Sequence, residues 1–474
     1  MKKSTSLLLV PALILAMASC KKSSSDGSNV SKAQIQVGAS ISDYTTGGTL
    51  KGTMLTSKVY TIKRDIIVNK GDTLLVQKGV TLNMGDGVNI IVHGTILFLG
   101  AKDGAIIVTD PNRHKSTGAS VYSTDEAYKG GWGGIYCDTS CHLFVAKWTH
   151  FDFGGAALQT VPFSGPTVGN AFVMWFGCPG GSFIMEDSWM YGSSDDAVRF
   201  YGGHINVMRN TLEKLGGNGG DGFNSKSGTQ GNMAYNLFIG GATNGTKSSN
   251  DGGVNPQNMI AMYNNTYVNC GFRNTGTFGA RAGCAEVENN SRALVYNNII
   301  VDCLTGYRIA GGNNVTAKVY GADTGNHSDG PINQTSYGYN LMYASNVAVA
   351  NQFVPTNVAQ AVLTRPQSTD IPDMKTFLGA GYTFGATYDG TSLVGKNDPK
   401  FVNYTLPNVG YATQSSVDGF DFHLSGSSPA IGKGYKGFSP ITNVPVDENF
   451  GSSGITPPGS DLGCYQADGS GNQH

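Results

Sequence analysis

The stretch Gly181–Gly312 repeats one phrase five times: MEDSWM (185–190), MRNTLE (208–213), AYNLFI (234–239), YNNTYV (263–268) and YNNIIV (296–301). Each phrase has an anchor residue, and successive anchors are 23, 26, 29 and 33 residues apart: Asp187, Asn210, Asn236, Asn265 and Asn298. A short β-prone run and a Gly-rich turn follow each anchor, without helical periodicity. A repeat of this length, made of strands and turns, predicts a β-solenoid in which each repeat forms one coil.

Composition supports an all-β fold and limits the function. The chain has 474 residues, of which 67 are Gly, and only 14% are charged. This Gly content is about twice the average and is typical of short strands joined by tight turns. A solenoid grows beyond the usual domain size because each coil packs on its neighbours. The net charge is −1 and no basic cluster stands out, so we expect no nucleic-acid partner.

The first 20 residues have the pattern of an export signal. Lys2 and Lys3 precede the apolar run Leu7–Met17, which is too short to span a bilayer. The run LAMASC, ending at Cys20, resembles a bacterial lipobox. This resemblance implies a lipoprotein signal peptide at 1–20, lipidation of Cys20, and a lipid-anchored protein at the outer membrane or cell surface. Residues 21–58 are expected to form a polar tether and a lead-in or cap.

The β-helix is expected to occupy residues 59–465, with an irregular, loop-rich part at 313–396 and a disordered tail at 466–474. The phrase at 71–96, GDTLLVQKGVTLNMGDGVNIIVHGTI, resembles the opening coils of pectate-lyase-like proteins. The closing phrases DPKF (398–401), SPAIGKG (428–434) and DLGCY (461–465) resemble the last coils of the same fold. The resemblance implies a single-stranded right-handed parallel β-helix of roughly ten or more coils.

The stretch 187–228 is similar to a phrase in Bacteroidetes-type surface lipoproteins of unassigned activity. In this chain it reads DSWMYGSSDDAVRFYGGHINVMRNTLEKLGGNGGDGFNSKSG. The family has a second Asp pair where this chain has Gly220-Asp221. The resemblance therefore implies a β-helix at the cell surface, but it does not assign a reaction.

Carboxylates recur in the turns of the central coils. Asp195 and Asp196 are followed one coil later by Asp221 and one further coil later by Asp251. Stacked strands are about 4.8 Å apart, so these residues are expected to form a ladder. Asp196, Asp221 and Asp251 would suit Ca²⁺, and Asp195, Asp196 and Asp221 would suit glycoside hydrolysis. Capping of the turn backbone by Asp is the third interpretation.

A second candidate group lies near residue 290. Glu286 and Glu288 alternate on one strand and so share a face, and Arg281 and Arg308 are close in the order of the coils. Polysaccharide lyases of this fold hold Ca²⁺ with acidic residues and use Lys or Arg as the base. Glu286 and Glu288 would then be metal ligands, and Arg281 or Arg308 catalytic. A charged solvent face explains the same pattern.

Two tryptophans, Trp132 and Trp189, are candidates for stacking on sugar rings, although most aromatic residues of a solenoid pack inside it or cover its corners. The sequence thus predicts a monomeric cell-surface lipoprotein that binds glycan or another extracellular ligand, with membrane attachment through Cys20. The alternative is a polysaccharide lyase or glycoside hydrolase that acts on an acidic polysaccharide. Cys270 and Cys303 follow their anchors by five residues and are expected to be neighbours.

Overall fold

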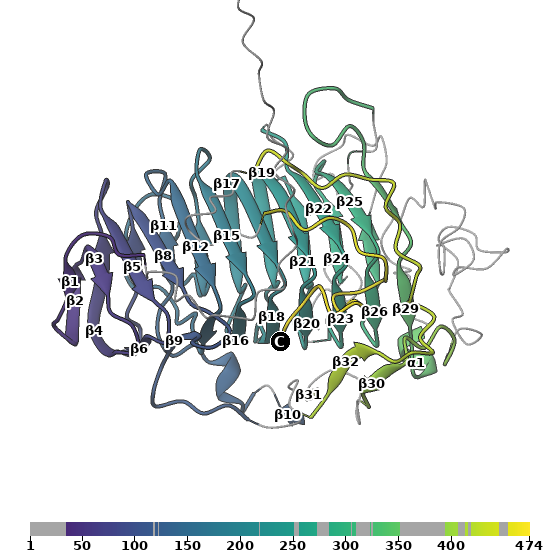
Figure 1. Ribbon diagram of the computed structural model, residues 1–474, viewed down its shortest axis with the longest axis horizontal. Coiled ribbons are helices and arrows are strands. Elements are labelled where there is room, and N and C mark those ends of the chain that lie inside the picture. The colour runs from purple at the N-terminus through teal and green to yellow at the C-terminus, as the bar shows by residue number, and fades with distance from the viewer. Residues whose placement is uncertain are drawn as a thin grey trace, which may run out of the picture. The chain divides into compact units, whose positions relative to one another are not determined.

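The computed structural model describes residues 35–116, 119–121, 123–217, 219–250, 256–272, 284–304, 306–309, 323, 326–350, 394–405, 413–415, 419–444 and 454–474. Residues 36–474 form one compact unit. Its strands wind into a parallel β-helix in which every strand of the main sheet pairs with a strand about one coil away (Figure 1). The described part contains two short helices, η1 (Glu126–Tyr128) and α1 (Val347–Ala350).

The strands stack in three columns. The first column is β1 (Ser40–Ile41), β3 (Gly52–Met54), β5 (Thr73–Gln77), β8 (Thr95–Leu99), β12 (Leu143–Lys147), β15 (Ser182–Glu186), the second halves of β17 (Val198–Met208) and β19 (Phe223–Ala234), β22 (Met259–Tyr263), β25 (Arg292–Tyr296) and β28 (Ser336–Gly338). These are eleven strands in one described column, which confirms an all-β parallel β-helix of ten or more coils.

The other two columns continue the same coils. The second is β2 (Thr45–Thr49), β4 (Val59–Val68), β6 (Thr81–Met84), β9 (Ile106–Thr109), β13 (Thr149–Asp152), β16 (Trp189–Ser193), β18 (Thr211–Leu215), β20 (Leu237–Ile239), β23 (Thr266–Val268), β26 (Ile299–Val301) and β29 (Leu341–Tyr343). The third joins the ends of β2 and β4 to β7 (Ile90–Val92), β11 (Ile135–Cys137), β14 (Met174–Phe176), the first halves of β17 and β19, β21 (Thr246–Ser249), β24 (Ala285–Glu288) and β27 (Tyr307–Ile309).

Alternation along each strand separates the core from the outer faces. On β17, Val198 and Phe200 point inward into the main core, whereas Arg199 is only partly buried. Aromatic rings stack from coil to coil in the interior, and the Phe144 and Phe183 rings are parallel with centroids 4.3 Å apart. Full burial of each such side chain contributes about 1.5–3 kcal/mol to folding.

An asparagine ladder ties neighbouring coils together. It is made by Asn210, Asn236, Asn265, Asn298 and Asn340, all buried. The side-chain oxygen of each later Asn accepts hydrogen bonds from the backbone and side-chain nitrogens of the Asn before it, both at 3.0 Å for Asn265 and Asn236. The ladder confirms the repeat phrase as the unit of the fold, because it satisfies buried backbone donors that the turns would otherwise leave without partners.

The first anchor is one residue off the prediction. Ser188, not Asp187, aligns with Asn210, because the Ser188 backbone N–H donates to the Asn210 side-chain oxygen at 3.0 Å. Asp187 instead occupies the turn position before the ladder, where φ is 48°. Arg209 has the corresponding position one coil later, with φ 58°. The misalignment arose because Asp and Asn are both common at left-handed turn positions.

The C-terminal part of the chain lies across the outside of the β-helix. Residues 419–444 and 454–474 cover apolar side chains that point outward from the first two columns, such as Ala261 and Val268, and form a second core with them. Within this segment, β32 (Asp421–Leu424) forms a short antiparallel pair with β30 (Phe401–Asn403), and β10 (Ala119–Val121) pairs with β31 (Thr413–Ser415). We call residues 419–444 and 454–474 the C-terminal cover.

Two boundaries differ from the expected ones. The stack begins at Ser40, within the expected lead-in, since β1 and β3 pair in the first column. The expected disordered tail at 466–474 is seated on the coils, because Asn472 is buried and its side-chain nitrogen donates to the Asn210 carbonyl at 3.0 Å. Within 313–396, the described residues 336–343 form the predicted coil anchored at Asn340. In the described ranges, no helix combines the length and apolarity needed to cross a membrane.

Candidate functional site

Asp196 and Asp221 form the predicted ladder at the start of the third column. Asp196 lies just before β17 and Asp221 just before β19, and the Asp221 backbone N–H donates to the Asp196 carboxylate at 2.8 Å. The ladder continues with Asn244, whose side chain donates to Asp221 at 2.7 Å and to Glu286 at 2.7 Å. Asp251, which the sequence places on the next step, is outside the described residues.

Hydrogen bonds occupy all four carboxylate oxygens of Asp196 and Asp221. Asp196 accepts from Arg199 Nε at 2.7 Å and from the Asn224 amide at 2.9 Å. Asp221 accepts from the same Asn224 amide at 2.8 Å. Across the described ranges, no group of three or more His, Cys, Asp or Glu side chains has the geometry to hold a metal ion. The described bonds of Asp196 and Asp221 are those of turn capping, and the Ca²⁺ interpretation, which also includes Asp251, stays a prediction.

Asp195 differs from its neighbours. Its pKa is raised to about 7, mainly by burial and also by the negative charges of Asp196 and Asp221, while Arg199 acts in the opposite direction. At neutral pH this carboxyl group is therefore divided between its acid and base forms. Such a group is suited to general acid–base catalysis.

The raised pKa of Asp195 predicts a pH dependence of stability. The folded state holds this proton up to about pH 7, whereas an unfolded Asp loses it near pH 4. The folded state thus binds more protons in this window, so stability falls as pH rises from about 4 to 7. Asp195→Asn should flatten that part of the profile, measured as urea midpoints at several pH values. Equal slopes for the two proteins would contradict the assignment.

Three basic side chains extend outward from successive strands of the third column. Arg199 is on β17, Lys226 on β19 and Lys247 on β21. Asn224 of β19 pairs in register with Arg199 on one side and with Lys247 on the other. Lys247 forms ion pairs with Glu286 at 3.3 Å and with Glu288 at 2.8 Å. We call Arg199, Lys226 and Lys247 the basic row.

Lys226 is the unusual member of the basic row. It is partly exposed, and its ammonium group has no hydrogen bond or ion pair within the described part of the chain. Burial lowers its pKa, and the neighbouring charges of Lys247 and Arg199 lower it further. A cation without a counter-ion in a partly buried position is a candidate for contact with an anionic ligand.

Glu286 and Glu288 do share one face of β24, as the sequence predicted. They bind Lys247 rather than forming a recognisable metal site with each other. Arg308 pairs in register with Glu286 on β27, and Arg281 lies outside the described residues. The sequence interpretation missed Arg199 and Lys226 as site residues. Strict alternation in VRFY (198–201) and FNSK (223–226) would have placed both on the outer face.

An aromatic strip leads along the third column toward Lys226. The Phe163 and Trp175 ring centroids are 5.5 Å apart, and those of Trp175 and Tyr201 are 5.6 Å apart. Tyr201 is the register partner of Lys226 on the next strand. Trp175 itself is buried, whereas Phe163 and Tyr201 are partly exposed, so Tyr201 offers an accessible ring beside Lys226.

The two tryptophans singled out from the sequence have different environments. Trp132 is fully buried, and its indole N–H donates to the Asp152 carbonyl at 2.8 Å. Trp132 thus fills a corner of the coil and presents no face to a sugar. Trp189 is partly exposed on β16, and its indole N–H donates to Glu213 at 3.0 Å. Trp189 therefore keeps the access that a ligand-binding aromatic residue needs.

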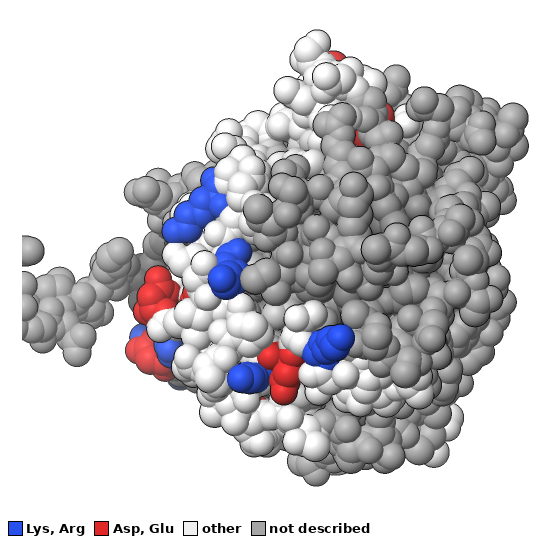
Figure 2. Space-filling model, turned by 90° about the vertical axis from the view of Figure 1, so that its right-hand side faces the viewer, with Lys and Arg blue, Asp and Glu red and all other residues white. Residues whose placement is uncertain are grey.

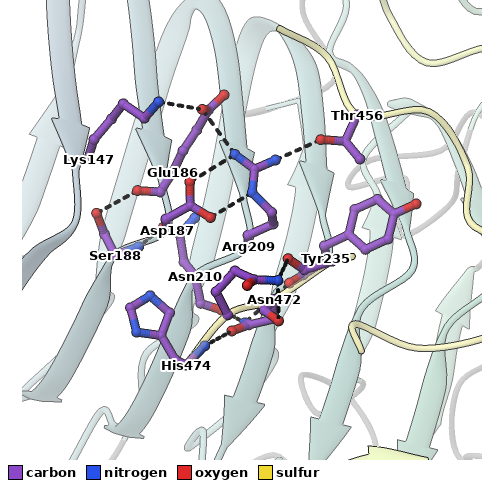
Figure 3. A network of polar contacts seen from close by, with 12 residues as sticks. Lys147, Glu186, Asp187, Ser188, Arg209, Asn210, Tyr235, Thr456, Asn472 and His474 are labelled. Carbon is purple, nitrogen blue, oxygen red and sulfur yellow. Dashed lines mark hydrogen bonds and ion pairs between the residues drawn. The ribbon is translucent and has the colours of Figure 1, made fainter. Parts of the chain in front are cut away.

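A buried charge network lies where the C-terminal cover meets the coils (Figure 3). Arg209 donates to Asp187 at 2.6 Å, to Glu186 at 3.1 Å and to Thr456 of the cover at 2.6 Å. Lys147 completes the network 3.8 Å from Glu186. Every member has a partner, so this network fastens the cover rather than offering a site.

The cysteines form buried clusters of free thiols. In one cluster, the Cys270 backbone N–H lies 3.4 Å from Cys303 Sγ, which confirms that these two residues are neighbours, and Cys284 adjoins them. Burial raises the pKa of Cys284 and Cys303 well above the usual value. These thiols are therefore poor nucleophiles.

The fold and these side chains together define a class: a parallel β-helix protein with a basic and aromatic outer face on its third column. At the C-terminal end of the stack, in the described part of the surface, acidic and basic side chains are mixed (Figure 2). No family model matches the chain, and neither a curated protein nor a solved structure matches it.

Proposed function

We propose that this chain is a cell-surface lipoprotein whose β-helix binds an acidic glycan along the outer face of the third column. The observation that carries the proposal is Lys226, a partly exposed cation that has no ion pair within the described residues and lies beside Tyr201. Resemblance of the stretch 187–228 to surface lipoproteins supports the location, and the aromatic strip supports a saccharide as the ligand.

The basic row gives this face its preference for acidic sugars. Arg199 is held by Asp196 and Lys247 by two glutamates, so both keep their charge but are already engaged. Of these three residues, Lys226 is the one without an ion pair in the described part of the chain, and it is therefore placed to receive a carboxylate or sulfate group. Hydrogen bonds between charged groups are roughly twice as strong as neutral ones. The Tyr201 ring, which is partly exposed beside Lys226, would pack on the apolar face of the neighbouring sugar.

Binding by Lys226 is tested with Lys226→Gln, which keeps the length of the side chain and removes its charge. We expect binding of polygalacturonate to weaken about tenfold or more, as loss of a charged hydrogen bond implies, measured by calorimetry or affinity electrophoresis. Lys63→Gln, at an exposed lysine on β4, is the matched control and should bind like the parent. Equal affinity of the Lys226→Gln protein and the parent would refute the role of this face.

A second candidate function is a polysaccharide lyase, favoured by the lowered pKa of Lys226. A neutral lysine amine can remove the proton adjacent to a uronate carboxylate, after which the bond to the leaving sugar oxygen breaks. Formation of unsaturated uronate products by the parent, but not by Lys226→Gln, would support this activity. Binding without unsaturated products across acidic polysaccharides would leave glycan binding alone.

The lipid anchor has its own test. Cys20 lies outside the described residues, so the proposal depends on the signal-like sequence before it. Cys20→Ala should abolish labelling of the protein by radioactive palmitate and release it from the membrane fraction. Ser24→Ala, in the tether, should change neither property. Unchanged labelling of Cys20→Ala would exclude lipidation at this position.

A further inference from the structure

Four rings gather on the outer face of the second column, away from the basic row. Trp148 lies just before β13, and His150 and Trp189 are register partners on β13 and β16. His150 and Trp189 stack with centroids 5.7 Å apart, and His474 lies 5.4 Å from both tryptophan rings. All four residues are partly exposed. We call them the aromatic platform.

The aromatic platform is uncharged at neutral pH. The pKa of His150 is lowered to about 4, mainly by burial, with Lys115 and His474 acting in the same direction. Burial likewise lowers the pKa of His474, although Asp187 acts in the opposite direction. Both imidazoles are therefore neutral at neutral pH, and the rings present apolar faces that suit the C–H face of a sugar.

Two lysines border the aromatic platform. Lys115 Nζ lies 5.8 Å from the centre of the Trp189 ring and is paired with Asp152 at 3.0 Å. Lys102 Nζ lies 5.9 Å from the centre of the Trp148 ring. Lys102 is exposed and has no ion pair within the described ranges. One rim of the platform therefore carries an available positive charge.

We propose that the aromatic platform is a second saccharide-binding site, in which a sugar ring stacks on Trp148 and Trp189 while Lys102 receives its carboxylate. The ligand class is an acidic oligosaccharide. The site belongs to another column than Lys226, so it does not depend on the proposed function of the basic row. Two sites on one chain would increase its retention on a polymer through effective concentration, without new contacts at either site.

The experiment separates the two sites by working in a Lys226→Gln background. Hexagalacturonate is titrated while tryptophan fluorescence and heat are recorded. We expect saturable binding with a fluorescence change, and weakening of about tenfold or more in Trp189→Leu, since aromatic residues dominate binding energies. Lys102→Gln should weaken hexagalacturonate binding severalfold and leave the thermal midpoint unchanged, because Lys102 is exposed.

Three results would overturn the proposal. One is the absence of saturable binding in the Lys226→Gln background. Another is unchanged affinity in both Trp189→Leu and Lys102→Gln. The third is a lack of preference for the acidic ligand: the Lys226→Gln protein would bind hexagalacturonate and neutral cellohexaose with the same affinity, and so would its Lys102→Gln derivative. If Lys226→Gln alone has no effect while Trp189→Leu does, the basic row fails and the aromatic platform stands.

Discussion

Replacement of Arg209 by methionine is expected to destabilise the protein by roughly 3–5 kcal/mol, the cost of removing one partner from a buried ion pair. The Arg209 side chain is 10% exposed and its partners Glu186 and Asp187 are 0% and 8% exposed. Without the guanidinium, the two buried carboxylates lose their shared ion-pair partner, and Lys147 lies 3.8 Å from Glu186. The measurement is the free energy of unfolding from urea titrations.

A matched control for Arg209 is the exposed pair Lys78–Asp103, 3.1 Å apart. Lys78→Met should cost less than about 1 kcal/mol, since water screens such a pair. Arg209→Met should also loosen the C-terminal cover, because Thr456 loses its partner. Faster proteolysis within the cover would report this directly. If Arg209→Met were as stable as Lys78→Met, the network in Figure 3 would contribute little to the free energy of unfolding.

Asn265→Ala is expected to cost roughly 2–4 kcal/mol, because it interrupts the asparagine ladder at its centre. The Asn265 side chain accepts from both nitrogens of Asn236 and donates to the Met233 carbonyl at 2.9 Å. Its removal takes these partners from the Asn236 backbone N–H and the Met233 carbonyl, at about 1–3 kcal/mol each, whereas the Asn236 side-chain nitrogen still donates to the Val207 carbonyl. Because one coil loses contact with two neighbours, the urea midpoint should fall without a change of fold.

The ladder prediction has an internal comparison. Asn112 is exposed, and its side chain forms no hydrogen bond within the described residues. Asn112→Ala should therefore change the free energy of unfolding by less than about 0.5 kcal/mol. Asn265→Asp tests the chemistry, because a carboxylate keeps the acceptor and loses the donor to Met233. If Asn265→Ala and Asn112→Ala were similarly stable, the asparagine ladder would contribute little to the stability of the fold.

The coil repeat could be predicted from sequence because one residue type marks it. Each anchor must fill a buried turn position and both donate and accept hydrogen bonds, which Asn does and few residues match. The anchors from Asn210 to Asn340 could therefore be recognised in the sequence. The first anchor was assigned to the wrong residue because Ser188, which fills the ladder position, directly follows Asp187, and Ser and Asp are both common in turns.

The C-terminal cover could not be predicted in the same way. Its docking depends on contacts between segments about 200 residues apart, such as the Ile441 backbone N–H with the Asn232 side chain at 2.9 Å. No local period marks such a contact. The polar composition of 466–474 favoured a disordered tail, yet Asn472 bonds to Asn210 across 262 residues.

The candidate site was predicted in part. The spacing of Asp196 and Asp221 in the sequence predicts that they form a ladder, but it does not predict which groups donate hydrogen bonds to their carboxylates. Whether a turn carboxylate binds a metal or its own backbone depends on the groups it faces, here Arg199 and Asn224. Lys226 was missed because a lysine on a strand is usually solvated, and only its lack of a partner makes it notable.

The C-terminal cover gives the stack a mechanical property that coils alone lack. In a simple solenoid each coil contacts only its neighbours, so the stack can unravel from either end. The cover bonds to coils at Asn210, Asn264 and Asn297, including the Asn297 side chain with the Tyr435 backbone at 2.8 Å. The cover thus links distant coils to one another, so we expect these coils to unfold together rather than one by one from an end.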